Sequence, residues 1–268
     1  MKLIIDFCPT GMIPTKEMTP LVPLSVNEII NDTLEASTLG ITKVHIHARD
    51  PNGKPTYKKD IYREIIEGIR KYSDVVVCLS TSGRTFKTFE ERSECLDLFP
   101  DMASLTLSSL NFNKEESVNS PDMIHDLALV MQAWGIKPEL EVFDIGMINY
   151  AKYLIKKNLL NPPYYFNLLL GNIACAQADP LYLGLMLREL PADSVWSAAG
   201  IGEAQLPMNS MAIALGGGVR VGLEDNIWYN KERTQLASNM DLLRRIHRIV
   251  EANEREIMTP SEFRGLIW

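Results

Sequence analysis

The feature that most constrains the fold of this chain is an alternation of short apolar runs with longer amphipathic stretches, repeated eight times. Several of the runs are rich in β-branched residues or almost wholly apolar, as is typical of strands buried on both faces of a parallel sheet. The expected strands are Leu3–Phe7, Lys43–His47, Val75–Leu79, Met102–Leu107, Glu139–Phe143, Tyr165–Leu170, Val195–Ala198 and Val219–Leu223. Eight strand–helix units in one uninterrupted chain predict an α/β fold, a (β/α)8 TIM barrel that spans residues 1–268 as a single domain.

Signals for the beginning and end of helices lie between these runs. Three Ser/Thr residues are followed three positions later by Glu, which is the spacing of a capping box. The pairs are Ser25 and Glu28, Thr88 and Glu91, and Thr259 and Glu262. Ser120 and Asp179 each stand before a proline, as at a helix N-terminus, and Gly40, Gly135 and Gly216–Gly218 follow expected helices, where a left-handed residue ends a helix.

The composition excludes several classes of partner. The net charge is -7 and no Lys/Arg-rich run appears, so we expect no nucleic-acid partner. The apolar stretch at the N-terminus is too short for a signal peptide, and no run reaches membrane-spanning length. We therefore expect a cytoplasmic protein that acts on a small molecule. The four cysteines lie far apart and are expected to be buried, reduced thiols.

The most informative motif is Val44–Arg49, which contains His45 and His47 at the carboxyl end of the second expected strand. Side chains two residues apart share a face of a strand, so both imidazoles point the same way. A barrel of this kind carries its active site at the carboxyl ends of its strands. Two imidazoles on one such face can bind one metal, whereas a lone histidine is more simply a hydrogen-bonded core residue. The other two histidines, His125 and His247, fall on expected surface helices.

The eighth expected strand supplies a carboxylate for the same site. Arg220, Gly222 and Glu224 share a face, and Glu224 stands at the carboxyl end. Only strand one separates strand eight from strand two in a closed barrel, so Glu224 completes a two-His-one-carboxylate site that leaves a coordination position for substrate. The alternative is a solvated loop carboxylate. The inward-facing Arg220 argues against that alternative, because a buried guanidinium needs a carboxylate partner.

Other polar residues at strand ends are weaker candidates. The hydroxyl residues among them are Ser80, Ser104 and Thr106, and each is as consistent with a structural cap as with a functional contact. Glu141 is stronger, since a carboxylate that points into a barrel must be paired or chemically useful. Gly200 and Gly202 precede a helix after the seventh strand, where barrels often bind phosphate on backbone N–H groups. We expect them to contact a phosphorylated cofactor.

Over essentially its whole length the chain resembles the β-keto acid cleavage enzymes, of the 3-keto-5-aminohexanoate cleavage enzyme type. The segments that carry the resemblance are Pro9–Gly11, Val44–Arg49, Leu79–Thr81, Pro138–Val142, Ala199–Gly202 and Gly217–Asn226. The resemblance implies a zinc-bearing homo-oligomer, a tetramer or dimer, that condenses a β-keto acid with acetyl-CoA to give acetoacetate and a new acyl-CoA. It places the metal, zinc or another divalent ion, on His45, His47 and Glu224.

The resemblance also assigns catalytic roles to Arg220 and Asp225, with Ser80 and Glu141 in support. A Lewis-acidic metal on the carboxylate and keto oxygens would stabilise an enolate. Asp225, oriented by Arg220, would remove the α proton as general base. The Ser80 hydroxyl would donate to the developing oxyanion, a contact worth roughly 3–4 kcal/mol where such donors have been removed.

One position departs from the family pattern. The 3-keto-5-aminohexanoate enzyme has a glutamate two residues after its Thr-Gly, implied to hold the substrate amino group, and this chain has Ile13 there. An apolar side chain offers no partner for a buried ammonium. We therefore expect Ile13 to face the distal end of a neutral or apolar β-keto acid.

Three other functions compete with this interpretation. An amidohydrolase-type enzyme also uses H-x-H in a barrel, but on strand one and with further histidines or a lysine on later strands. A metal-dependent barrel aldolase is a closer alternative, because it too uses an enolate. A non-catalytic protein with a structural metal is disfavoured, since structural zinc sites normally have four protein ligands rich in cysteine.

Overall fold

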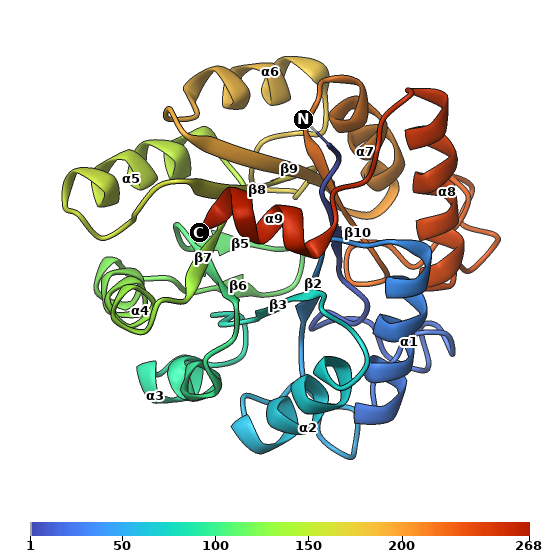
Figure 1. Cartoon of the computed structure of the whole chain (residues 1–268), viewed down its shortest axis with the longest axis horizontal. Coiled ribbons are helices and arrows are strands. Elements are labelled where there is room, and N and C mark those ends of the chain that lie inside the picture. The colour runs from blue at the N-terminus through green and yellow to red at the C-terminus, as the bar shows by residue number, and fades with distance from the viewer. Residues whose placement is uncertain (1) are drawn as a thin grey trace.

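The computed structural model describes residues 2–268, in which all eight expected runs form strands of one closed parallel barrel (Figure 1). Going round the barrel, the strands follow the order β1, β10, β9, β8, β7, β4, β3 and β2. Their bounds are β1 Ile5–Phe7, β2 Lys43–Ile46, β3 Val76–Leu79, β4 Met102–Thr106, β7 Lys137–Val142, β8 Tyr164–Leu170, β9 Ser194–Gly200 and β10 Gly218–Val221. The predicted fold class is confirmed.

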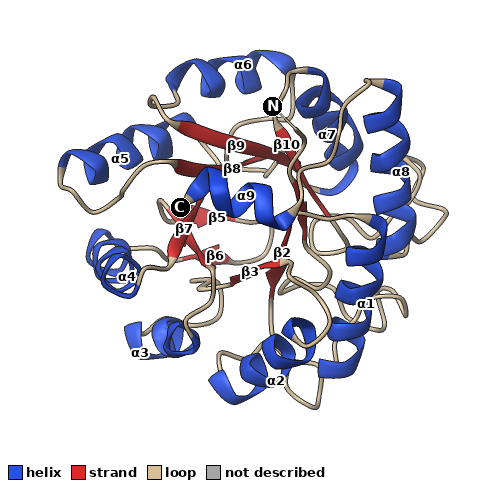
Figure 2. Ribbon diagram, in the orientation of Figure 1, coloured by secondary structure: helices blue, strands red, loops and turns tan. Residues whose placement is uncertain are grey.

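The helices form an outer ring around the strands (Figure 2). Their bounds are α1 Val26–Leu39, α2 Lys59–Arg70, α3 Phe89–Ser93, α4 Pro121–Trp134, α5 Ile145–Lys156, α6 Pro180–Glu189, α7 Gln205–Ala214 and α8 Asn239–Ala252, with 3-10 turns η1 Glu94–Leu98 and η2 Gly202–Ala204. The capping boxes at Ser25, Thr88 and Thr259 are all present, and Ser120 and Asp179 cap α4 and α6. Local sequence signals therefore place most helix beginnings correctly.

Two elements depart from a plain eightfold repeat. A hairpin of β5 (Leu110–Asn111) and β6 (Glu116–Ser117) is inserted between β4 and α4, and the sequence pattern did not predict it. A last helix, α9 (Pro260–Ile267), lies across the barrel where the strands begin (Figure 1). There the Phe263 ring packs edge-to-face on Tyr165, with ring centroids 5.5 Å apart. The amino end of the barrel is thus closed by apolar side chains.

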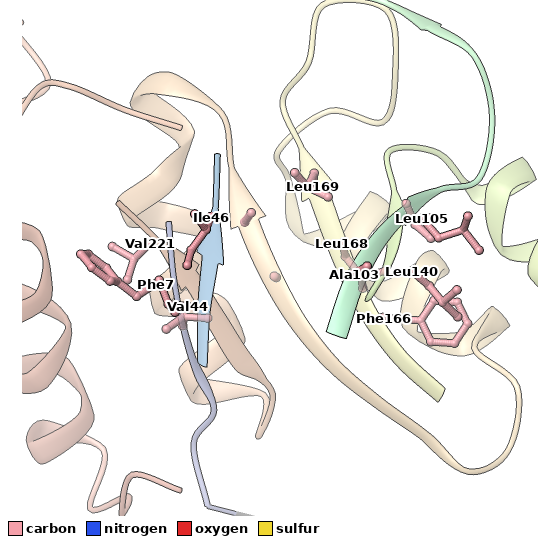
Figure 3. Close-up of a cluster of buried hydrophobic side chains, with 14 of the residues drawn as sticks. Phe7, Val44, Ile46, Ala103, Leu105, Leu140, Phe166, Leu168, Leu169 and Val221 are labelled. Atoms are coloured by element: carbon pink, nitrogen blue, oxygen red, sulfur yellow. The ribbon is translucent and has the colours of Figure 1, made fainter. Parts of the chain in front are cut away.

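The two faces of each strand carry different chemistry. Outward-facing side chains such as Val44, Ile46 and Leu140 form the apolar layer that packs against the helices (Figure 3). The inward-facing positions include a smaller apolar cluster at the amino end and many buried polar and charged residues, namely Asp6, Lys43, His45, Ser104, Glu139, Asn167, Ser197 and Arg220. A barrel interior with so many buried charges must pair them or use them, because an isolated buried charge is very costly.

The remaining expectations about the chain as a whole concern cysteines and membranes. Cys8, Cys78 and Cys95 are buried and Cys175 is partly exposed; all four are free thiols. Within residues 2–268 no helix has both the length and the apolar character needed to cross a membrane.

Candidate active site

The two histidines of β2 and its following loop lie together at the carboxyl end of the barrel, as predicted. His45 and His47 are 1% and 5% exposed, and their Nε2 atoms are 3.2 Å apart. The two rings are tilted by 47° with centroids 5.0 Å apart. His125 and His247 lie on α4 and α8, outside the barrel interior. The strand periodicity therefore predicted correctly that these two side chains lie together.

Glu224, just beyond β10, joins this pair across β1. Its Oε1 atom lies 3.1 Å from Nε2 of His47. The loop after β1 fixes its position: Gly11 has φ +68°, and a Cβ at Gly11 would lie 2.5 Å from Cγ of Glu224. Only glycine permits that approach. The Arg49 guanidinium holds the same loop by hydrogen bonds to the carbonyls of Gly11 and Pro14.

The three side chains fit a divalent metal. One ligand atom from each of His45, His47 and Glu224 lies within 4.8 Å of the others. The second carboxylate oxygen of Glu224, Oε2, is buried and has no hydrogen-bond partner in the described part of the chain. A buried, unsatisfied carboxylate oxygen beside two converging imidazole nitrogens fits the donor set of a two-His-one-carboxylate metal site.

A second group of possible ligands, His45, Cys78 and Glu139, is also close enough to hold an ion, but its chemistry does not fit one. The Lys43 ammonium lies 3.2 Å from Oε1 of Glu139 and already supplies the positive charge. Burial, followed by the neighbouring Glu139 carboxylate, raises the pKa of Cys78 well above its usual value, and a protonated thiol is not a metal ligand. The triad of His45, His47 and Glu224 at the carboxyl end of the barrel is therefore the metal candidate.

Arg220 links the candidate catalytic carboxylates into one cluster. It is 2% exposed, and its Nε donates to Oδ2 of Asp225 at 2.9 Å. Its Nη2 donates to Oε1 of Glu224 at 2.6 Å, and its Nη1 reaches Oε1 of Glu141 at 3.4 Å. The expectation that an inward-facing Arg220 would pair with carboxylates is confirmed. One planar guanidinium thus orients three acidic side chains at once.

The surroundings of Asp225 and Glu224 shift the pKa values of these two carboxylates in opposite directions. Burial is the largest influence on Asp225 and, although Arg220 opposes it, the pKa of Asp225 stays raised. Burial also raises that of Glu224, but Arg220 and His47 outweigh it and leave the pKa of Glu224 lowered. A carboxylate kept ionised suits a metal ligand, and a carboxylate with a raised pKa is a stronger base for proton transfer.

Three hydroxyl residues lie around the cluster in different roles. Ser80 lines a small cavity together with His47, and its Oγ accepts a hydrogen bond from the Ser82 N–H at 3.2 Å. Ser104 is engaged with the backbone: its Oγ accepts from the Thr81 N–H at 3.1 Å. Thr106 Oγ donates to Oε2 of Glu141 at 2.7 Å. Ser104 therefore braces the loop that carries Ser80, and Thr106 orients Glu141.

The glycine loop after β9 corrects one expectation. The Ile201 N–H donates to the carbonyl of Leu170 at 3.0 Å, and the Gly202 N–H donates to the carbonyl of Asp225 at 2.7 Å. These two donors are already used, so they are not free to hold a phosphate. Gly200 instead permits close packing, because a Cβ there would collide with the backbone of Ala204.

Ile13 lies in the loop after β1 and is 46% exposed. Its neighbour Met12 lines the small cavity that also contains His47 and Ser80. Lys16 in the same loop turns to Glu28 of α1, with Nζ 2.6 Å from Oε1. The loop thus borders the site, with Met12 on its inner side.

The sequence pattern missed a fully buried set of polar residues directly beneath the triad. Glu139 accepts a hydrogen bond from Nδ1 of His45 at 2.8 Å. Asp6 and Lys43 form an ion pair at 2.7 Å, both fully buried. A signal was available: Glu139 shares a strand face with Glu141, and both Asp6 and Lys43 interrupt apolar strands at inward positions.

A parallel barrel with two imidazoles, a carboxylate and an arginine-bound aspartate at its carboxyl end defines a class, the (β/α)8-barrel enzymes with a candidate metal centre. Comparison with known proteins gives the particular family. The model of the beta-keto acid cleavage enzymes matches residues 2–267. The chain belongs to this family.

Two curated relatives show the range of activities within it. The 3-keto-5-aminohexanoate cleavage enzyme of Fusobacterium nucleatum subsp. nucleatum is 38% identical over an alignment of 268 positions, which covers 99% of this chain and 97% of that protein. The 3-oxoadipate:acetyl-CoA acetyltransferase of Cupriavidus necator is 35% identical over an alignment of 268 positions, which covers 98% of this chain and 94% of that protein. Among solved structures, the apo structure of ObcA has a TM-score of 0.82 at 21% identity, covering 92% of this chain and 65% of that one; this likeness shows the fold alone.

Proposed function

We propose that the chain transfers an acyl group between a β-keto acid and acetyl-CoA. The bond between the keto carbon and the α carbon of the β-keto acid breaks. The acyl group that contains the keto carbon passes to the sulfur of CoA, the acetyl group passes to the α carbon of the released carboxymethyl unit, and the products are acetoacetate and a new acyl-CoA. Within a family of beta-keto acid cleavage enzymes, the observation that carries this proposal is the environment of Asp225. Its carboxylate is buried, bound by Nε of Arg220, and next in sequence to the Glu224 metal candidate.

In this reaction Asp225 takes the α proton of the β-keto acid, because it combines a raised pKa with a fixed orientation. Arg220 holds Asp225 and Glu141 in place and balances the negative charge that develops on the substrate. A divalent metal on His45, His47 and Glu224, zinc by its donor set, would supply Lewis acidity to the substrate oxygens.

The neighbouring hydroxyl groups complete the site. We propose that Ser80, at the carboxyl end of β3 and beside His47, donates its O–H to the oxyanion formed when the acyl group transfers. Ser104 and Thr106 contribute to substrate binding through the loop and the carboxylate that they hold.

An acetoacetate assay with acetyl-CoA and a panel of β-keto acids tests the proposal. We expect acetoacetate and acyl-CoA to form in equal amounts, and only when acetyl-CoA is present. A metal-dependent aldolase would cleave its substrate without CoA. Cleavage that is independent of acetyl-CoA, or no acetoacetate from any member of the panel, would overturn the assigned reaction.

We further propose that the substrate has no amino group at its distal end. The support is Ile13, an apolar side chain at the position where the resemblance to the 3-keto-5-aminohexanoate enzyme implies an acidic residue. The adjacent Met12 makes the inner side of this loop apolar. A substrate whose distal end is neutral or apolar is the best complement to the inner side of this loop.

Assembly and location complete the proposal. We propose a cytoplasmic homo-oligomer, a dimer or tetramer. Large apolar side chains remain exposed on the outside of this single chain, including Ile173 and Leu181 at 67% and 69% exposure near the beginning of α6. Light scattering during size-exclusion chromatography measures the mass directly, and a monomer at micromolar concentration would contradict this part.

A further inference from the structure

Beneath the metal candidate, Glu139 of β7 touches the ligand His45 from the far side. Its side chain is fully buried, and its Oε2 lies 2.8 Å from Nδ1 of His45. The two residues are 94 positions apart and lie on strands separated by β3 and β4. The contact therefore crosses the barrel interior. It engages the ring nitrogen that faces away from His47, whose Nε2 is 3.2 Å from Nε2 of His45.

Four donors fix the Glu139 carboxylate from all sides. Oε2 accepts from Nδ1 of His45 and from the thiol of Cys78 at 2.9 Å. Oε1 accepts from Nδ2 of Asn167 at 2.6 Å and from Nζ of Lys43 at 3.2 Å. Each oxygen thus has two donors, so rotation of the carboxylate would break several bonds at once.

Lys43 supplies the charge that this arrangement requires. It precedes His45 by two residues on β2, so the same strand face carries the ammonium and the metal ligand. Its Nζ is bound by Asp6 at 2.7 Å and Glu139 at 3.2 Å, and lies 5.2 Å from the centre of the Tyr165 ring. A buried carboxylate stays ionised only beside such a fixed cation.

An ionised carboxylate can only accept hydrogen bonds, so the proton of neutral His45 must reside on Nδ1. Its Nε2 then carries a lone pair, directed toward His47 and the metal position. Carboxylate–histidine pairs of this kind orient metal ligands in many proteins and raise their basicity. A contact of this kind with an ionised Glu139 would fix the orientation of the His45 ring and favour the tautomer of neutral His45 that carries its proton on Nδ1.

We propose that Glu139 is a positioning residue of the metal centre, held in place by Lys43 and Asn167, and that it determines metal affinity through the tautomer of His45. This inference rests on the proposed metal site. The charged layer below the triad then has a functional role beyond filling the barrel.

The tautomer can be read in the wild-type protein without metal. Histidine is labelled with 15N, and long-range 15N–1H correlations of the imidazole rings are recorded on the chelator-treated protein. The His45 signals are assigned by their loss in His45→Gln. We expect the Nδ1–H form for His45. An Nε2–H form would overturn the proposal, and this readout depends neither on metal binding nor on a variant at Glu139.

Metal affinity is then measured in Glu139→Gln by competition between the protein and a chromophoric chelator for Zn2+. A glutamine has one acceptor oxygen, so either His45 or the Lys43–Asn167 pair loses its acceptor. We expect binding about 10–100-fold weaker than in wild type, and an altered visible spectrum of the Co2+-loaded protein.

Tyr165→Phe is the matched control. It removes a fully buried hydroxyl from the same interior, one that donates to Oγ of Ser197 at 2.8 Å and has no hydrogen bond to Glu139. Zn2+ affinity should stay within about twofold of wild type. Unchanged affinity in Glu139→Gln, or an equal loss in Tyr165→Phe, would overturn the positioning role. Failure of the wild type to bind Zn2+ would instead overturn the metal site, leaving the tautomer result to judge Glu139.

Discussion

Two layers of the barrel interior contain buried charged residues but differ in how those residues are paired. The upper layer is the cluster at the carboxyl ends of the strands, and the lower layer is Asp6, Lys43 and Glu139. At the carboxyl end, the buried Oε2 atom of Glu224 has no hydrogen-bond partner among residues 2–268. At mid-height, the charges of Asp6, Lys43 and Glu139 are all paired at 2.7–3.2 Å. Incomplete satisfaction costs stability, and proteins retain it where a ligand or a reaction needs the free group. This difference distinguishes the candidate active site from the layer of paired charges that supports it.

Removal of a ligand from the upper layer should have the largest effect. We expect His45→Ala or Glu224→Ala to lose the bound metal and all measurable turnover, because two remaining donors hold a divalent ion poorly. Elemental analysis after desalting gives the metal content per chain, with about one ion expected in wild type. His125→Ala, on the exposed face of α4, is the control. Full metal content in both ligand variants would disprove the assignment.

Replacement of the proposed base should be the next largest effect. We expect Asp225→Asn to lower kcat by about 10²–10⁴-fold while the protein still folds and binds metal, since an amide cannot take a proton. Arg220→Lys should also be damaging, because lysine lacks the fork that orients Asp225 and Glu141 together. Steady-state kinetics combined with metal analysis measures both. Wild-type kcat in Asp225→Asn would remove it from the mechanism.

A substitution in the lower layer should act mainly on stability. Lys43→Met leaves the Asp6 and Glu139 carboxylates buried without their shared cation. Breaking a buried pair from one side costs about 3–5 kcal/mol, and the free energy of unfolding in urea measures the loss. Asp225→Asn in the upper layer should cost much less. Equal stabilities of the two variants would contradict the contrast between the layers.

The smallest expected effect is on substrate preference and concerns Ile13, in the loop after β1. We expect wild type to prefer a neutral or apolar β-keto acid over 3-keto-5-aminohexanoate by about tenfold or more in kcat/KM, because Ile13 offers the ammonium no partner. Ile13→Glu should narrow or reverse that preference. Equal or better activity of wild type on the amino substrate would end this hypothesis.

Much of the site could be predicted from the sequence because strand periodicity is local. His45 and His47 share a face whatever surrounds them, and the same rule places Arg220 and Glu224 together. The order of strands in a closed barrel then brings β10 next to β1 and within one strand of β2. A correct count of strands was sufficient to place the triad.

Three features lay beyond that local rule. The hairpin of β5 and β6 is too short to show a periodicity. The N–H of Gly202 appeared free to bind a phosphate, yet it donates to Asp225, 23 positions later in the chain. Glu139 and Glu141 both face inward, and nothing in the local pattern indicates which of the two carboxylates meets a histidine.

The sequence by itself determined the alternating elements, their caps, and which side chains face inward, because these depend on neighbours within a few residues. Only the tertiary structure decided which inward charges meet. Glu139 reaches His45 and Lys43, and Arg220 joins Glu224 to Asp225, through the register and closure of the barrel. A local pattern does not encode those long-range distances, and they are what makes one layer of buried charges reactive and the other a support.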